Sequence, residues 1–258
     1  MTEICLETQA LSRQFGALAA VQKVDFKLHA GARHALIGPN GAGKTTFVNL
    51  LTGVLAPTRG RVLLGGRDIT AKAQAERVKL GLARTFQINR LFRGLSVLEN
   101  VCIAVAERLG AAPSMFYPAG KRVDVIEESM SLLATLKLDD VAGRRVSELP
   151  YGRQRLVELA IAIGLRPQAL LLDEPAAGVP SAETHIILDA IERLPARIAV
   201  LIIEHDMDVV FRFAKRVTVM VGGAVFAEGT PREIEANADV RAVYLGQDGA
   251  GAANGRRA

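Results

Sequence analysis

The first third of the chain alternates apolar and polar residues in short runs, a period-two pattern typical of half-buried strands. This pattern predicts strands over Cys5–Leu11, Val21–Leu28 and Arg61–Leu64. Gly65-Gly66 follows the last run and predicts a tight turn. We therefore expect an antiparallel β portion at the N-terminus.

The pattern becomes helical after Ala83-Arg84-Thr85-Phe86. Apolar residues recur at helical spacing over Val97–Leu109 and Val125–Leu138, separated by Gly110–Gly120, which is rich in glycine, alanine and proline. Such a stretch is too long for an ordinary connection. It predicts a helical subdomain inserted at about residues 88–163.

Helical and strand-like segments then alternate, which indicates βαβ units and a mainly parallel core sheet. Two continuous apolar runs, Ala169–Leu172 and Ala199–Ile203, suit strands covered on both faces. The fold class predicted is therefore α/β. The other predicted elements from here on are Gly152–Ile163, Ser181–Leu194, Met207–Phe213, Val217–Val221, Pro231–Ala236 and Val240–Leu245.

Composition narrows the class of protein. Half of the 258 residues are apolar, so a sizeable core can form, and residues 1–246 are predicted to make a single domain with 247–258 as a disordered tail.

The net charge is +5, but the basic residues are scattered among few aromatics, which disfavours nucleic-acid binding and favours a position near a membrane. No apolar run is long enough to span a bilayer. Two cysteines provide no disulfide framework and suit a reducing cytosol.

One glycine-rich segment carries the strongest chemical signal. It follows the apolar run Ala35–Ile37 and precedes Phe47–Leu51, which gives the strand–loop–helix context of a phosphate-binding P-loop. Its residues are Gly38, Pro39, Asn40, Gly41, Ala42, Gly43, Lys44, Thr45 and Thr46. Backbone N–H groups and the helix start would hold the phosphates, with Lys44 on the β- and γ-phosphates and Thr45 on Mg²⁺. A nucleoside triphosphate is the predicted ligand, and a GTPase is disfavoured because no Asn-Lys-x-Asp guanine reader occurs.

Acidic residues end the next apolar strand. Asp173 and Glu174 follow Ala169–Leu172, where ligands collect in an α/β sheet, so Asp173 is placed to hold Mg²⁺ and Glu174 to act as general base. The alternative is a solvated acidic pair. His205 similarly follows Ala199–Ile203 and is a candidate to contact the γ-phosphate or the attacking water, although a lone histidine is more often structural.

Two further residues are candidates for the nucleotide site. Gln87 begins the helical insertion, where its amide can contact Mg²⁺ or water. Phe15 precedes Gly16 and can stack on a base, or else it is a core aromatic of an early strand.

Along the chain the motifs occur in the order aromatic residue, P-loop, glutamine, helical subdomain, signature, Asp-Glu strand end and histidine. This order resembles that of the ATP-binding subunit of an ABC transporter, and the resemblance extends to about Gly246. The family's signature corresponds here to Leu149, Pro150, Tyr151, Gly152 and Arg153. The Pro-Tyr-Gly form is similar to branched-chain amino acid importers. Other segments that fit that group are Ala83–Gln87, Arg90–Phe92, Leu98–Asn100, Asp173–Gly178, Gly229–Pro231 and Tyr244–Gly246.

The resemblance implies how the protein works. The expected cofactors are ATP and Mg²⁺, and each ATP lies between one P-loop and the signature of a second ATP-binding subunit. The expected partners are two transmembrane permease subunits and, indirectly, an extracytoplasmic solute-binding protein. The expected location is peripheral, on the cytoplasmic face of the inner membrane.

Departures from the family pattern leave details open. Pro150 replaces a serine and Arg153 a glutamine, and Pro180-Ser181 stands where related importers carry Asn-Pro. These departures favour a heterodimer with unequal ATP sites, with a homodimer as the alternative. Two other functions remain open: an exporter subunit, or a soluble ABC ATPase, although the fused halves or long coiled coil of the latter are missing.

Overall fold

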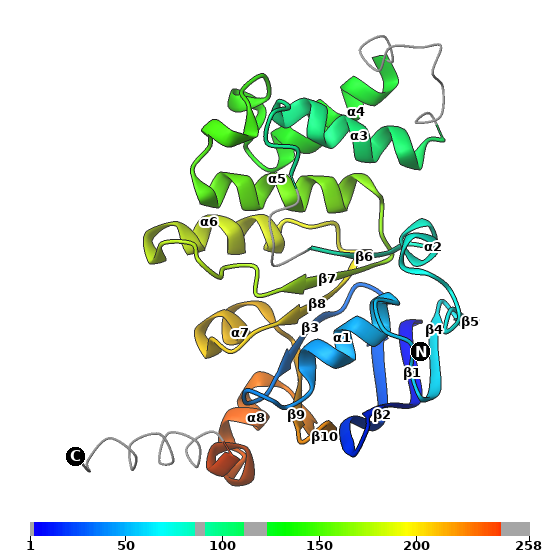
Figure 1. Cartoon of the computed structure of the whole chain (residues 1–258). Coiled ribbons are helices and arrows are strands. Elements are labelled where there is room, and N and C mark those ends of the chain that lie inside the picture. The colour runs from blue at the N-terminus through cyan, green and yellow to red at the C-terminus, as the bar shows by residue number, and fades with distance from the viewer. Residues whose placement is uncertain (1–2, 86–90, 111–122, 244–258) are drawn as a thin grey trace, which may run out of the picture. The chain divides into compact units, whose positions relative to one another are not determined.

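A computed structural model describes residues 3–85, 91–110 and 123–243. The chain divides into two compact units, whose helices and strands are labelled in Figure 1. Unit 1 comprises Met1–Arg77 and Arg197–Ala258, and unit 2 comprises Val78–Ala196. Each unit is described by itself below.

Unit 1 begins with an antiparallel sheet in the order β2-β1-β4-β5. Its strands are β1 (Ile4–Phe15), β2 (Leu18–His29), β4 (Arg59–Leu64) and β5 (Arg67–Asp68). The alternation buries one face, including Leu6, Leu11 and Val24. This sheet confirms the predicted antiparallel portion. Strand β1 extends beyond its predicted end because bulges between Thr8 and Gln14 shift its register and hide the alternation.

The second sheet region of unit 1 has β3 (Arg33–Ile37) at its centre. It pairs in parallel with β8 (Ala199–Ile203) and with β9 (Arg216–Val221), and β10 (Ala224–Gly229) pairs antiparallel to β9. Every residue of β8 is buried, as the continuous apolar run predicted. Strand β10 was not predicted.

The helices that accompany these strands include α1 (Lys44–Thr52), α7 (Met207–Phe213) and α8 (Pro231–Ala236), and α2 (Gln74–Lys79) begins in unit 1 and ends in unit 2. A buried arginine donates hydrogen bonds to the C-terminal end of α1. Arg77 is 1% exposed and donates hydrogen bonds to the carbonyl oxygens of Leu50, Leu51 and Thr70, at 2.8, 2.6 and 2.8 Å. The bonds to Leu50 and Leu51 reach carbonyls of the last turn of α1, which a helix end leaves without intrahelical partners.

Unit 2 contains a parallel strand pair, β6 (Leu82–Arg84) with β7 (Ala169–Asp173), and a set of helices. The helices are α3 (Val97–Arg108), α4 (Val123–Thr135), α5 (Tyr151–Gly164) and α6 (Ser181–Glu192), with 3₁₀ turns at Asp139–Val141 and Val146–Glu148. Helix α5 packs against α3, α4 and α6. The described helices α3, α4 and α5 therefore lie between β6 and β7 in the sequence. The predicted linker at 110–120 and tail at 247–258 lie largely or wholly outside the described residues.

The described helices include none with the length and apolar character needed to cross a bilayer.

A buried histidine makes the stability of unit 1 depend on pH. The Nε2 atom of His34 lies 2.8 Å from the hydroxyl of Thr218, and its ring meets Phe26 edge-on. Burial lowers the pKa of His34 from 6.5 to about 4, with Glu228 opposing the shift and Arg216 adding to it. Between these two pKa values the unfolded chain binds a proton that the folded protein does not, so stability falls as pH falls.

We expect about 3 kcal/mol of unfolding free energy to be lost through His34 between pH 7 and pH 4. Urea unfolding of the wild type and of His34→Asn over this range measures it. The asparagine can keep a hydrogen bond to Thr218 but cannot titrate, so its stability should vary less with pH. Equal pH dependence in the two proteins would contradict the assignment to His34.

Candidate functional site

The P-loop of unit 1 connects β3 to α1 and is shaped by two glycines. Gly38 has φ 152° and Gly43 has φ 94°. A Cβ on Gly38 would lie 2.2 Å from the carbonyl oxygen of Met220, and one on Gly43 would lie 2.4 Å from that of Ala20. Only glycine therefore fits at these two points, and the loop backbone is held closely against its neighbours.

Hydrogen bonds hold the loop in place. Gly223 donates to the carbonyl of Ala42 at 3.0 Å. The ammonium of Lys44 donates to the carbonyls of Gly38 and Pro39, so it lies across the loop. Thr45 is exposed at the start of α1. Gly43 has no side chain to cap this helix, and its first turn holds no acidic residue. The positive end of the helix is therefore suited to an anion, since its first turn carries no carboxylate that would compete with one.

His205 reaches the same edge of the sheet as the P-loop. Leu36 of β3 pairs with Ile203 of β8, and the strands run parallel, so their carboxyl ends lead side by side into Gly38 and His205. The imidazole of His205 is exposed. Sequence reasoning missed its neighbour Glu204, which is buried at 3% exposure. Its position directly after the apolar strand Ala199–Ile203 could have indicated that Glu204 lies at the same sheet edge as His205.

Phe15 ends β1 in unit 1 and is 42% exposed, so it is not a core aromatic. The guanidinium of Arg13 lies 4.6 Å from the centroid of its ring. Across the hairpin, β2 carries Ala20, whose carbonyl faces Gly43 at the start of α1. The exposed ring therefore belongs to a hairpin that packs beside the P-loop.

The acidic pair of unit 2 lies at the end of β7. Asp173 is 2% exposed and forms an ion pair with Arg84 of the neighbouring strand β6. Sequence reasoning missed Arg84, because only the pairing of β6 with β7 brings it to Asp173. Glu174 has φ 45°, a left-handed conformation that costs roughly 1–3 kcal/mol in a residue other than glycine. Such strain is concentrated at active sites, which supports a chemical role for Glu174.

The signature segment begins α5 of unit 2. Pro150 occupies the N-cap, no side chain caps the helix, and its first turn holds no acidic residue. The guanidinium of Arg153 lies 2.7 Å from the carboxylate of Asp140. A Cβ on Gly178 would lie 3.4 Å from the ring of Tyr151, so the loop after Glu174 passes beside the signature.

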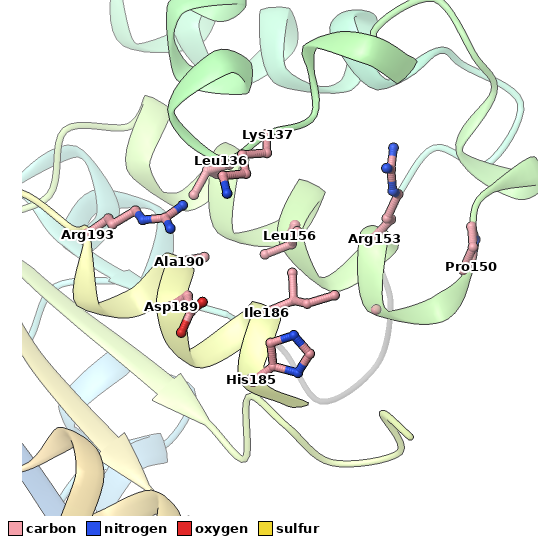
Figure 2. A pocket seen from close by; sticks show the side chains of 11 residues that line it. Leu136, Lys137, Pro150, Arg153, Leu156, His185, Ile186, Asp189, Ala190 and Arg193 are labelled. Carbon is pink, nitrogen blue, oxygen red and sulfur yellow. The ribbon is translucent and has the colours of Figure 1, made fainter. Parts of the chain in front are cut away.

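A hollow of about 370 Å³ adjoins this segment (Figure 2). Pro150, Arg153 and Leu156 of the signature region line one side, and His185, Ile186 and Asp189 of α6 line another. The hollow is thus lined by apolar side chains such as Leu156 and Ile186 and by charged side chains such as Arg153 and Asp189.

Two of the predicted magnesium contacts, one in each unit, carry oxygen donors of the type that suits a magnesium ion. The hydroxyl of Thr45 and the carboxylate of Asp173 are hard ligands of the kind that Mg²⁺ prefers. Within the described ranges, no group of three or more histidine, cysteine or acidic residues could hold a metal by itself. Mg²⁺ commonly relies on one or two carboxylates plus substrate phosphates. Gln87, the other predicted metal contact, lies outside the described residues.

Comparison with family models gives two matches. Residues 21–177 match the family described as ABC transporter, and residues 224–250 match the family described as branched-chain amino acid ATP-binding cassette transporter. Among curated proteins, the chain is 37% identical to the high-affinity branched-chain amino acid transport ATP-binding protein BraF of Pseudomonas aeruginosa, over 96% of this chain and all of that protein. It is 36% identical to LivG, a protein of the same description from Escherichia coli, over 96% of this chain and all of that one.

Solved structures similar to this chain are also ATP-binding cassettes of ABC transporters. The ADP conformation of an ATP-binding cassette of an ABC transporter superposes with a TM-score of 0.83 at 32% identity, covering 95% of this chain and all of that one. A nucleotide-free cassette superposes with a TM-score of 0.81 at 31% identity, covering 93% and 98% of the two chains. The predicted α/β P-loop fold is thereby confirmed, and the chain belongs to the ABC transporter family as an ATP-binding cassette ATPase.

Proposed function

We propose that this chain is the ATP-hydrolysing subunit of a membrane importer for branched-chain or related amino acids. The observation that carries the proposal is the full-length similarity to BraF and LivG, whose names describe high-affinity branched-chain amino acid transport. The separate match of residues 224–250 to a branched-chain amino acid cassette family supports the same assignment.

ATP binding is assigned to unit 1. The N–H groups of Gly38–Thr46 and the start of α1 bind the phosphates, and the ammonium of Lys44 moves from loop carbonyls to phosphate oxygens. The exposed ring of Phe15 stacks on the base. The closed packing around Gly38 and Gly43 supports this role, because it fixes the loop before the anion arrives.

Hydrolysis is assigned to the carboxylates and the histidine. Glu174 accepts the proton of the attacking water, and the imidazole of His205 holds the γ-phosphate or that water. Thr45, Asp173 and Gln87 would hold Mg²⁺, which would supply positive charge to neutralise the phosphates. The strained backbone of Glu174 and the position of His205 beside the P-loop edge support these assignments.

The signature is assigned to the nucleotide of a second ATP-binding subunit. The uncapped start of α5 would meet that γ-phosphate, and Arg153 would exchange Asp140 for the nucleotide. A bacterial ABC transporter cassette with this fold, at 22% identity and a TM-score of 0.73, has been solved as a dimer. Pro150 and Arg153 make this chain's signature unlike the family's, so we propose a heterodimer with unequal sites.

Transport requires the pair to act on two permease subunits at the cytoplasmic face of the membrane. ATP-dependent pairing and release would move the helical part of the chain as a rigid body and switch the permeases. A solute-binding protein outside the membrane would deliver the amino acid.

Reconstitution tests the proposal. The chain, two permeases, a second ATPase and the binding protein are assembled in proteoliposomes, and ATP hydrolysis is measured with and without leucine. Hydrolysis should rise with leucine-loaded binding protein and depend on both ATPases. Transport restored by this chain without a second ATPase would contradict the heterodimer, and no response to any branched-chain amino acid would contradict the solute assignment.

A further inference from the structure

The ion pair between Arg84 and Asp173 is the starting point. The two residues end the parallel neighbours β6 and β7, with Arg84 in register with Leu171. An Nη2 group of Arg84 donates to the Oδ2 atom of Asp173. The side chains are 10% and 2% exposed, so the pair is almost fully removed from water.

The environment of Asp173 explains why it needs a partner. A carboxylate buried to this degree is strongly disfavoured unless a cation or several hydrogen-bond donors compensate its charge. Mg²⁺ would supply that charge once a nucleotide is bound. In the protein without metal, Arg84 supplies it from the adjacent strand.

We propose that Arg84 is the resident counter-ion of Asp173, with which a divalent cation must compete. The carboxylate is neutralised before any metal arrives, so Mg²⁺ is retained only together with the negative charge of a nucleotide. This inference rests on the proposed function, because it takes Asp173 as a metal-holding residue.

Two physical effects determine whether Arg84 raises or lowers the affinity for a divalent cation. The ion pair between Arg84 and Asp173 stabilises the metal-free protein, and it is weakened when a metal occupies the carboxylate. Metal binding must therefore overcome this stabilisation, which lowers the affinity for the metal. A guanidinium near the metal also repels it by Coulomb's law. Both effects oppose metal binding, so a neutral residue at position 84 should tighten it and should also destabilise the metal-free protein.

The test uses Mn²⁺ as the probe, with free Mn²⁺ measured by electron paramagnetic resonance in the absence of nucleotide. Arg84→Gln should bind Mn²⁺ about tenfold or more tightly than wild type, the factor that corresponds to losing a charged hydrogen bond. Its urea midpoint should be lower than wild type without metal and should rise on adding Mn²⁺, while the wild-type midpoint stays constant. Arg84→Lys keeps the positive charge and should behave like wild type.

Two sets of variants serve as controls. Arg108→Gln removes an arginine from a comparable partly buried pair with Glu128 in the same unit, and it should leave Mn²⁺ binding unchanged. Adding Asp173→Asn to Arg84→Gln should abolish the gain in affinity. If Arg84→Gln folds only with Mn²⁺ present, that dependence supports the proposal, and failure to fold with Mn²⁺ overturns it.

Unchanged or weaker Mn²⁺ binding by Arg84→Gln would overturn the counter-ion role. A separate result addresses the proposed function: Asp173→Asn should weaken Mn²⁺ binding to the ATP complex. If it does not, Asp173 does not hold the metal in the ATP complex, and that assignment of the proposed function fails even where the nucleotide-free Mn²⁺ titration of Arg84→Gln gives the expected gain.

Discussion

Glu174→Gln is expected to lower the turnover of ATP roughly 10²–10⁴-fold, the usual contribution of a general base. The substitution keeps the size of the side chain and a hydrogen-bonding amide but removes the group that accepts the proton. ATP should still bind, because the phosphate-binding loop belongs to unit 1 and Glu174 to unit 2. Single-turnover phosphate release and equilibrium ATP binding measure the two effects separately.

Glu192→Gln is the matched control for that substitution. Glu192 is an exposed residue at the end of α6 in the same unit, and neutralising it should leave turnover near the wild-type rate. Wild-type turnover in Glu174→Gln would remove Glu174 from the proton transfer. Loss of ATP binding in the same variant would show that its effect is structural.

Lys44→Ala is expected to weaken ATP binding roughly 10- to 100-fold or more, since each charged hydrogen bond contributes roughly 1.5–3 kcal/mol. The ammonium of Lys44 already lies over the loop, held by the carbonyls of Gly38 and Pro39, so it is positioned for an incoming phosphate. Isothermal titration of ATP measures the change in Kd. The binding of adenosine, which has no phosphates, should change much less.

Lys72→Ala is the matched control in the same unit. Lys72 forms an exposed pair with Glu76 at 2.8 Å, an arrangement that contributes little to stability. Its removal should leave the Kd for ATP unchanged. An equal loss in both variants would indicate a general effect of charge, and unchanged binding by Lys44→Ala would contradict the phosphate-binding role of this loop.

The sequence predicted the parts of the fold that local patterns determine. The apolar run Ala199–Ile203 coincides with β8, and Met207–Phe213 and Pro231–Ala236 coincide with α7 and α8. Helix α7 begins after Asp206, which accepts hydrogen bonds from its first turn, and α8 begins with a capping box at Thr230. These signals lie within a few residues of the elements they start, so no tertiary information is needed to read them.

Elements that depend on partners distant in sequence were harder to predict. Strand β10 exists because it pairs with β9 across the Gly222-Gly223 turn, and its own alternation is weak. Helix α2 is short and polar, and the buried Arg77 ties it to the end of α1. The periodicity of a short segment cannot reveal such contacts.

In the candidate site, too, some features follow from local sequence and others depend on residues distant in sequence. The P-loop and the acidic strand end were identifiable because their chemistry requires fixed residue types at fixed spacing. The contact between Arg84 and Asp173 joins residues far apart in sequence through strand pairing. The arginine therefore carried no local signal of its role, and only the paired strands bring it to the carboxylate.

The central claim is that ATP holds this cassette against the signature of a second ATP-binding subunit. Glu174→Gln, which binds ATP without consuming it, is mixed with the second ATPase and Mg²⁺, and the mass of the complex is measured by light scattering during gel filtration. We expect a one-to-one complex that forms with ATP and dissociates with ADP. If no ATPase subunit pairs with this chain under those conditions, the account of its mechanism is contradicted.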